Sequence, residues 1–267
     1  MAKLRTIFGF SGERLTTEEI DFFRDAQPWG FILFDRNVSS PNQLKSLTAS
    51  LRALMAQNDL PILIDQEGGR VARLKGPHWR HPPAAREFGR LYAVDQEAAL
   101  HACRTNSRLI GRELRSSGVT VDCLPVLDLP AAGSHDVIGT RAYGETVEQV
   151  IALGSAAAEG LVQAGVLPVM KHVPGHGRAA GDSHLELPRI SATHNEMSQT
   201  DFLPFKALAD LPLAMTAHLV YEDIDPELPA TFSTKVIENV IRGEIGFDGL
   251  LMTDALSMKA LPGSFRN

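Results

Sequence analysis

The feature that most constrains the fold of this chain is a repeated alternation of short apolar runs with longer stretches of helical periodicity. Seven apolar runs are present, at residues 6–10, 31–34, 61–64, 119–121, 166–170, 213–217 and 250–253. The helical stretches between them are 17–26, 41–57, 96–117, 147–164, 195–209 and 234–242. This alternation is typical of βα units and predicts a parallel sheet.

Nothing in the sequence divides the chain into separate units. We find no repeated motif, low-complexity tract or proline-rich linker, so we expect a single domain over residues 1–267. Parallel βα units within one domain favour a TIM-type (β/α) barrel. Local signals agree with this pattern, because Thr16 and Glu19 have the spacing of a capping box and Ser40-Pro41 places a proline in a first helical turn.

Composition narrows the class of protein. Hydrophobic residues make up 44% and charged residues 22% of the chain, values typical of a compact soluble protein. The net charge is -6 and there is no run of Lys or Arg, so we expect no nucleic-acid partner. The N-terminus has no export signal, and Cys103 and Cys123 are too few for a disulfide framework. We therefore expect a cytoplasmic protein that does not bind membranes.

Ionisable residues follow four of the predicted strands. Asp65 ends the third run, Lys171 and His172 end the fifth, His218 ends the sixth and Asp254 ends the seventh. The carboxyl ends of the strands of a parallel barrel emerge on one face, so these side chains should converge on one pocket. The alternative is that each residue only marks the point where a buried strand reaches solvent.

The segment from Lys171 to His184 is the densest in reactive side chains. It carries His172, His176, Asp182 and His184 among several glycines, and the Asp182 carboxylate is close enough in sequence to orient the His184 imidazole. These four residues could also ligate zinc, but their spacing fits no standard zinc pattern and nearby cations oppose a dication. His176 could instead hydrogen-bond only the backbone. We expect no metal and no cofactor.

Four motifs carry a resemblance to a known family. They are the segments 64–74, 138–143, 171–184 and 251–256, within a similarity that runs from Ile7 to about Phe265. With these motifs the chain resembles the β-N-acetylhexosaminidases of glycoside hydrolase family 3 that serve bacterial peptidoglycan recycling, and through it cell-wall biogenesis, cell shape and cell division. The resemblance implies hydrolysis of terminal β-linked N-acetylglucosamine from fragments that contain anhydro-muramic acid.

The resemblance also implies a role for each matching residue. Asp254 would be the nucleophile, and His184, paired with Asp182, would be the acid/base. The residues that would bind the sugar are Asp65, Arg73, Arg141, Lys171 and His172. Retaining hydrolysis needs a carboxylate below the anomeric carbon and a proton donor above it. A histidine suits the second role because its ordinary pKa of about 6.5 lets it exchange protons near neutral pH.

Several polar residues receive other interpretations. Outside these motifs, surface salt bridges would be the ordinary role of residues such as Arg73 and Arg141. We predict that the Gly-Gly pair after Glu67 forms a tight turn in which Glu67 pairs with Arg70 or Arg73, and we assign it a structural role. Further polar residues could line the pocket but receive no chemical role, namely Asp122, Asp128 and His218.

The chain departs from the family after Asp254, where few residues remain. An eighth strand with its helix needs roughly thirty residues, so we expect an incomplete, C-terminally shortened barrel with unpaired edge strands. We expect the chain to be a monomer or a weak dimer. If the barrel is open, two copies could associate through the unpaired edge strands. The competing functions are a related β-glycosidase, a glycoside phosphorylase, or an inactive sugar-binding fragment.

Overall fold

The computed structural model describes residues 4–131, 136–179 and 187–257. Its main sheet has seven strands, all parallel, and their order across the sheet follows their order in the chain. They are β1 (Leu4–Phe8), β2 (Pro28–Leu33), β3 (Ile62–Ile64), β4 (Val121–Asp122), β5 (Leu167–Val173), β7 (Leu213–Thr216) and β9 (Leu250–Thr253). Each strand overlaps one predicted apolar run, which confirms the predicted parallel sheet of βα units.

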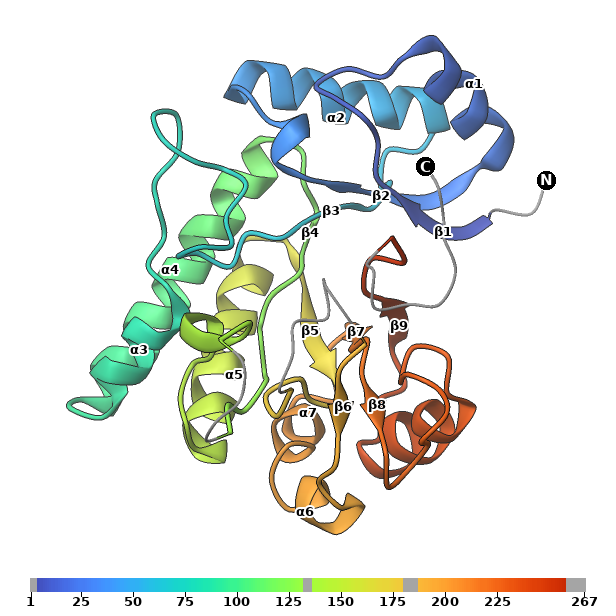
Figure 1. The fold of residues 1–267 in the computed structure, drawn as a ribbon. Coiled ribbons are helices and arrows are strands. Elements are labelled where there is room, and N and C mark those ends of the chain that lie inside the picture. The colour runs from blue at the N-terminus through green and yellow to red at the C-terminus, as the bar shows by residue number, and fades with distance from the viewer. Residues whose placement is uncertain (1–3, 132–135, 180–186, 258–267) are drawn as a thin grey trace.

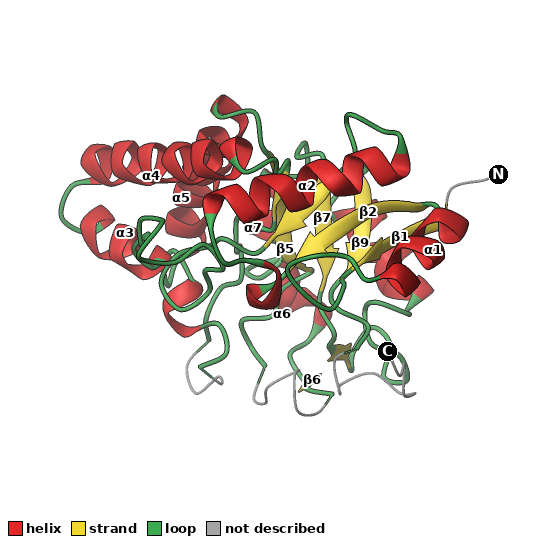
Figure 2. Ribbon diagram, turned by 90° about the horizontal axis from the view of Figure 1, so that it is seen from above, coloured by secondary structure: helices red, strands yellow, loops and turns green. Residues whose placement is uncertain are grey.

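Helices connect the strands and lie outside the curved sheet (Figures 1 and 2). They are α1 (Thr17–Ala26), α2 (Pro41–Met55), α3 (Ala85–Tyr92), α4 (Gln96–Ser116), α5 (Val147–Gln163), α6 (His194–Ser198), α7 (Leu203–Ala207) and a π-helix at Val236–Glu244. Short 3₁₀ turns lie at Asp35–Asn37 and Gly139–Arg141. Within the described ranges, no helix combines the length and the apolar character that crossing a membrane requires.

The starts of the first two helices follow the predicted capping signals. The Thr16 hydroxyl accepts from the backbone N–H of Glu19 at 3.2 Å, and the Glu19 carboxylate accepts from the backbone N–H of Thr16 at 2.9 Å. At α2 the Ser40 hydroxyl accepts from the Gln43 backbone N–H at 3.3 Å, with proline at the first turn. These bonds satisfy N–H groups that have no partner within the helix.

The core divides into layers on the two faces of the sheet. Leu63, Val121, Val169, Leu213 and Met252 belong to a cluster with members on five strands, which fills the concave face. Two larger clusters lie outside, one between the N-terminal half of the sheet and α1 to α5, the other between the C-terminal half and the later helices. The concave cluster therefore ties the two halves together.

Two predicted segments differ from the structure. The predicted helix over 195–209 is wrong as a single element, because α6 and α7 are separate and Pro204 stands in the first turn of α7. Proline lacks the N–H that would bond one turn back, so it favours a helix start and not an interior. Residues 66–93, for which we predicted no helix, contain α3, whose buried residues Ala85, Phe88 and Gly89 lie on one face.

The sheet is open between its first and last strands. Among the described residues, β1 pairs only with β2 and β9 pairs only with β7. A second, two-stranded parallel sheet of β6 (Arg189–Ile190) and β8 (Val220–Tyr221) lies beyond the carboxyl ends of β5 and β7 (Figure 1). The fold is thus an incomplete TIM-type barrel, as predicted, and its strand carboxyl ends surround a common region.

Candidate active site

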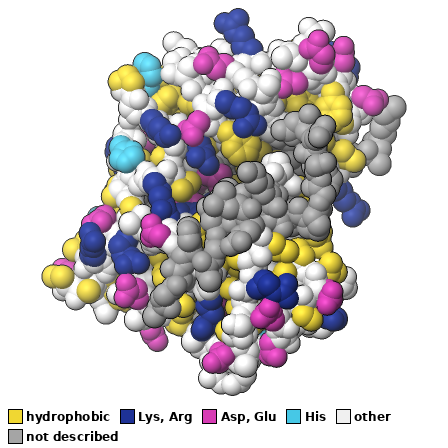
Figure 3. Space-filling model, viewed as in Figure 1, with side chains coloured by type: hydrophobic (Ala, Val, Ile, Leu, Met, Phe, Trp, Pro, Cys, Tyr) yellow, Lys and Arg dark blue, Asp and Glu magenta, His cyan; other side chains and the backbone are white. Residues whose placement is uncertain are grey.

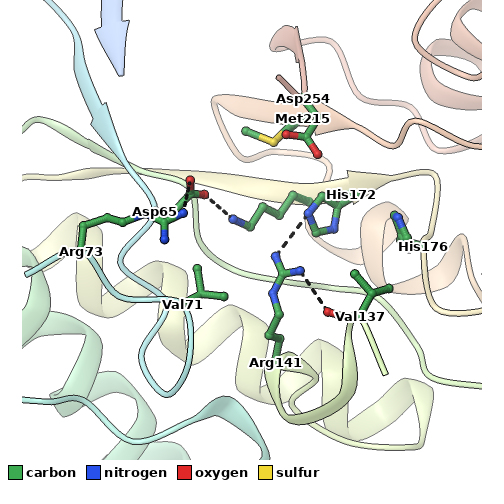
Figure 4. Close-up of a pocket in the computed structure, with 10 residues that line it drawn as sticks. Asp65, Val71, Arg73, Val137, Arg141, His172, His176, Met215 and Asp254 are labelled. Atoms are coloured by element: carbon green, nitrogen blue, oxygen red, sulfur yellow. Dashed lines mark hydrogen bonds and ion pairs between the residues drawn. The ribbon is translucent and has the colours of Figure 1, made fainter. Parts of the chain in front are cut away.

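A pocket of about 120 Å³ lies at the carboxyl ends of β3, β5 and β9 (Figure 4). Its polar lining residues are Asp65, Arg73, Arg141, Lys171, His172, His176 and Asp254, and its apolar ones are Val71, Val137 and Met215. The structure therefore brings together six of the eight residues that the sequence assigned to the site. The other two, Asp182 and His184, lie outside the described residues.

Lys171 is the most deeply buried charge of the pocket, with 1% of its side chain exposed. Its ammonium donates to Asp65 Oδ1 at 2.7 Å and lies 2.7 Å from Glu67 Oε1. Burial alone would lower the pKa of Lys171, but the two carboxylates raise it above its usual range. The lysine is therefore a fixed cation, held in place by two anions.

Arg141 and Glu67 form a buried, bidentate ion pair. Arg141 Nε and Nη2 donate to the two Glu67 oxygens, each at 2.8 Å. Burial alone would raise the pKa of Glu67, but Arg141 and Lys171 lower it below its usual range. Two parallel bonds fix the plane of a guanidinium as well as its position. Arg141 is therefore oriented toward the pocket and is not engaged in a surface salt bridge.

The predicted partners of Glu67 were wrong. Arg70 lies 3.2 Å from Asp136, and Arg73 bridges Asp35 at 3.6 Å and Asp65 at 3.5 Å. The predicted tight turn is present, since the backbone N–H groups of Glu67 and Gly68 both donate to Val71. The turn directs the Glu67 side chain inward, away from the arginines that follow it in sequence.

The loop that carries Arg73 is built around Gln66 and Gly68. The Gln66 side chain accepts from the backbone N–H groups of Arg73 and Leu74 at 2.7 and 3.0 Å. Gly68 has a φ of 103°, and a Cβ there would lie 2.4 Å from the Pro83 carbonyl oxygen. Only glycine fits this left-handed, closely packed position. These contacts hold the loop against the pocket.

Asp128 is a buried residue to which the sequence assigned no chemical role. Its carboxylate contacts His172 Nδ1 at 2.6 Å and accepts from the backbone N–H of His176 at 2.7 Å. Burial alone would raise the pKa of Asp128, but His172 and His176 lower it. The signal that could have indicated this residue is its position after the apolar run 124–127, where Val126 bridges to Lys171 of β5. Asp128 thus follows an isolated β-bridge to β5, two residues after Val126.

Asp254 lies at the end of β9, across the pocket from Asp65 in Figure 4. Burial would raise the pKa of its carboxyl, but His172, His218 and the Ala255 backbone N–H, 2.7 Å away, lower it below the ordinary value. His218 does not line the pocket, and its Nδ1 contacts Thr231 Oγ1 at 2.7 Å. Asp254 is therefore an ionised carboxylate at the end of a strand.

Metal ligation was the rival interpretation of the histidine segment. In the ranges that the structure covers, no group of three or more His, Cys, Asp and Glu side chains is arranged to hold a metal ion. Of the proposed zinc ligands, His172 Nδ1 contacts Asp128, the backbone N–H of His176 donates to the same carboxylate, and Asp182 and His184 lie outside the described residues. On the part of the surface that Figure 3 draws in colour, Lys and Arg side chains are interspersed with Asp and Glu side chains.

A curved parallel sheet with a charged pocket at its strand carboxyl ends defines the (β/α)-barrel class of enzymes. The model of the glycosyl hydrolase family 3 N-terminal domain matches residues 3–266, and the chain belongs to this family of glycoside hydrolases. The chain is 41% identical over 256 residues to a β-hexosaminidase of Alkalilimnicola ehrlichii. The match covers 95% of this chain and 72% of the relative.

Solved structures agree with this membership. The native NagZ of Neisseria gonorrhoeae matches with a TM-score of 0.90 at 35% identity, over 96% of this chain and 75% of that protein. The same protein in complex with N-trifluoroacetyl-D-glucosamine matches equally well, with a TM-score of 0.90 and the same coverage. The chain therefore spans about three quarters of the length of these relatives.

Proposed function

We propose that this chain is a retaining β-N-acetylhexosaminidase that releases terminal β-linked N-acetylglucosamine from peptidoglycan-derived fragments. The observation that carries the proposal is one pocket in which an ionised Asp254 faces the fixed cations Lys171 and Arg141 together with Asp65. The names of the relatives support the same substrate class, since one is a β-hexosaminidase and another was solved with a glucosamine derivative.

Asp254 is the proposed nucleophile. Its carboxylate attacks the anomeric carbon, forms a covalent glycosyl-enzyme and is released when water attacks the same carbon. Four neighbours favour the ionised form, namely His172, His218, the Ala255 N–H and Lys171. A nucleophile must also be held close to its attack geometry, which the end of β9 provides. His184, oriented by Asp182, is the proposed group that protonates the departing oxygen and then activates the water.

The opposite wall of the pocket would bind the sugar. Arg73, Arg141 and Lys171 supply N–H donors for hydroxyls and the acetamide oxygen, and Asp65 supplies an acceptor. Lys171 and Arg141 are already fixed by Glu67, so binding costs little further side-chain entropy. Their charges are largely neutralised by carboxylates, which suits a neutral sugar as the ligand.

The cytoplasm is the proposed location. Both cysteines, Cys103 and Cys123, are free and buried, which is typical of proteins from a reducing compartment. Burial raises the pKa of the Cys103 thiol to about 12, so this thiol stays protonated and unreactive. Cell fractionation with an antibody against the chain tests the location.

Substitution of the nucleophile tests the function directly. Asp254→Ala should reduce release of the chromophore from an aryl β-N-acetylglucosaminide by at least about 1,000-fold, because no covalent intermediate can form. Asp248→Ala, at an exposed carboxylate just before β9, is the matched control and should keep the activity. Unchanged turnover in Asp254→Ala would remove the proposed nucleophile.

The same assay separates the competing functions. A glycoside phosphorylase would release sugar phosphate only when phosphate is added, whereas a hydrolase needs none. Calorimetric binding of N-acetylglucosamine without any turnover by the unsubstituted chain would indicate a sugar-binding protein instead.

A further inference from the structure

We propose that Asp128 is a positioning residue that keeps the His172 proton on Nδ1, so that His172 Nε2 accepts a hydrogen bond from Arg141 at the sugar-binding wall. The inference rests on the proposed function, because that function makes Arg141 one of the residues that bind the sugar. Asp128 itself does not line the pocket and would act only through His172.

The Asp128 carboxylate is fully buried and its two oxygens have different partners. Oδ1 accepts from the backbone N–H groups of His176 and His172 at 2.7 and 3.2 Å. Oδ2 lies 2.6 Å from His172 Nδ1. Oδ1 thus accepts from two backbone N–H groups, and Oδ2 is the oxygen that contacts the imidazole.

The partners on both sides of the imidazole determine where its proton lies. An ionised carboxylate only accepts, so a contact of 2.6 Å requires the proton on His172 Nδ1. On the other side, Nε2 lies 3.4 Å from Arg141 Nη2, and a guanidinium only donates. Nε2 must therefore be the acceptor. The tautomer that carries its proton on Nδ1 satisfies both neighbours.

This tautomer matters because it completes the orientation of Arg141. Glu67 receives bonds from Nε and Nη2, the Val137 carbonyl receives one from Nη1 at 3.3 Å, and His172 receives the second bond of Nη2. Only one of the five guanidinium N–H groups, on Nη1, then lacks a partner within the described part of the chain. That group is available for a ligand in the pocket that Arg141 lines.

Replacement of the carboxylate by an amide should reverse the tautomer. In Asp128→Asn the two backbone N–H groups would hold the amide oxygen at the Oδ1 position, which places the NH₂ group against His172 Nδ1. Nδ1 must then accept, the proton moves to Nε2, and Nε2–H meets the Arg141 N–H donors. The amide has nearly the same shape as the carboxylate, so the change is in proton location more than in packing.

The first measurement is the tautomer itself. In protein labelled with ¹⁵N-histidine, with the His172 signals assigned by their loss in His172→Ala, the unsubstituted chain should show a protonated Nδ1. Asp128→Asn should show a protonated Nε2. A protonated Nε2 in the unsubstituted chain would overturn the proposal, and this outcome can be observed even if the variant does not fold.

The matched control is Asp122→Asn, because Asp122 is also a fully buried aspartate and lies at the end of β4. Asp122 Oδ1 accepts from the Gln66 backbone N–H at 2.9 Å, and within the described residues its Oδ2 has no hydrogen-bond partner. An amide can keep that single bond, so we expect the His172 tautomer and the turnover to stay as in the unsubstituted chain. A change of tautomer in Asp122→Asn would show that the signal reports general disturbance of the core and would overturn the assignment to Asp128.

Kinetics provide the second measurement. Asp128→Asn should lower kcat/KM by about 10- to 100-fold, as is typical when a residue that orients a binding group is replaced. In a His172→Ala background the same substitution should cost less than about threefold, because Asp128 acts through the imidazole. Full additivity of the two losses would contradict the proposal. The tautomer is measured without substrate, so it tests the role of Asp128 separately from the proposed hydrolase function.

Discussion

At the scale of single residues, the pocket consists of charges that other buried charges hold in place. Lys171 contacts two carboxylates, and Arg141 shares one of them, so no cation of this cluster is buried alone. Removing one partner from such a cluster costs about 3–5 kcal/mol, because it leaves an uncompensated charge in the interior. The cluster therefore constrains which substitutions the site tolerates.

His176 predicts how the stability of the protein depends on pH. Burial and the neighbouring His172 lower the pKa of His176 to about 4, below the ordinary value of 6.5. Between these values the unfolded chain binds a proton that the folded chain does not, so the free energy of unfolding falls as pH falls from about 6.5 to 4. The total contribution is at most about 3 kcal/mol.

This dependence can be isolated by substitution. Urea unfolding of His176→Gln at pH 7 and pH 4.5 should show a smaller loss of stability than the unsubstituted chain. His101→Gln, at an exposed position of α4, is the control and should keep the full pH dependence. An equal loss in all three proteins would contradict the assignment.

The residue types of the site were predictable from strand ends and motifs, whereas some of their partners were not. Asp65, Lys171, His172 and Asp254 were expected to converge, and they line one pocket. Glu67 was expected to bind an arginine close in sequence, yet it binds Arg141, 74 positions away. Such a pairing depends on the path of two loops, which local patterns do not encode.

At the scale of elements, the loop after β3 is the connection whose shape matters most for the site. Gly68→Ala places a methyl group against the Pro83 carbonyl at a positive φ, so we expect a loss of about 1–3 kcal/mol in unfolding free energy. Because the same loop carries Glu67 and Arg73, KM for the aryl glycoside should rise as well.

Gly12→Ala is the matched substitution, since a Cβ there meets no atom within 4 Å and the backbone φ is not positive. It should leave both the thermal midpoint and KM close to those of the unsubstituted chain. If Gly68→Ala behaved like Gly12→Ala, the loop would have to relax freely, and its proposed rigidity would be wrong.

Prediction of the helices succeeded where a periodic pattern and a cap occurred together. α1, α2, α4 and α5 begin at the predicted residues because a Thr, Ser or Asp side chain caps each of them. α3 was missed because it is short and begins at Ala85, after an N-cap residue, Ala84, whose side chain makes no capping hydrogen bond. The split between α6 and α7 was missed because the apolar period continues across it while Pro204 interrupts the hydrogen bonding.

At the scale of the whole molecule, the open sheet raises the question of how its two halves cooperate. The outer clusters of the N-terminal and C-terminal halves are separate, and the concave cluster around Val169 connects them. We predicted a single domain, and this arrangement leads us to expect one cooperative unfolding transition. Trp29 and Trp79 report on the N-terminal half, while far-ultraviolet circular dichroism reports on helices throughout.

The two signals should therefore change together in guanidinium chloride. Val169→Ala, in the connecting cluster, should lower both midpoints by the same amount, equivalent to about 1–3 kcal/mol. If tryptophan fluorescence completed its transition while circular dichroism still changed, the halves would be separate folding units and the single-domain prediction would be wrong.

The sequence by itself determined the seven strands of the main sheet, their parallel arrangement, and the placement of ionisable residues at strand ends. These features follow from local periodicity and from the rule that parallel strands end on one face. Only the tertiary structure decided that Glu67 binds Arg141 and that Asp128 contacts His172, 44 positions away. Buried ion pairs form between whichever complementary groups the loops bring within about 3 Å, and that distance depends on the packing of the whole molecule.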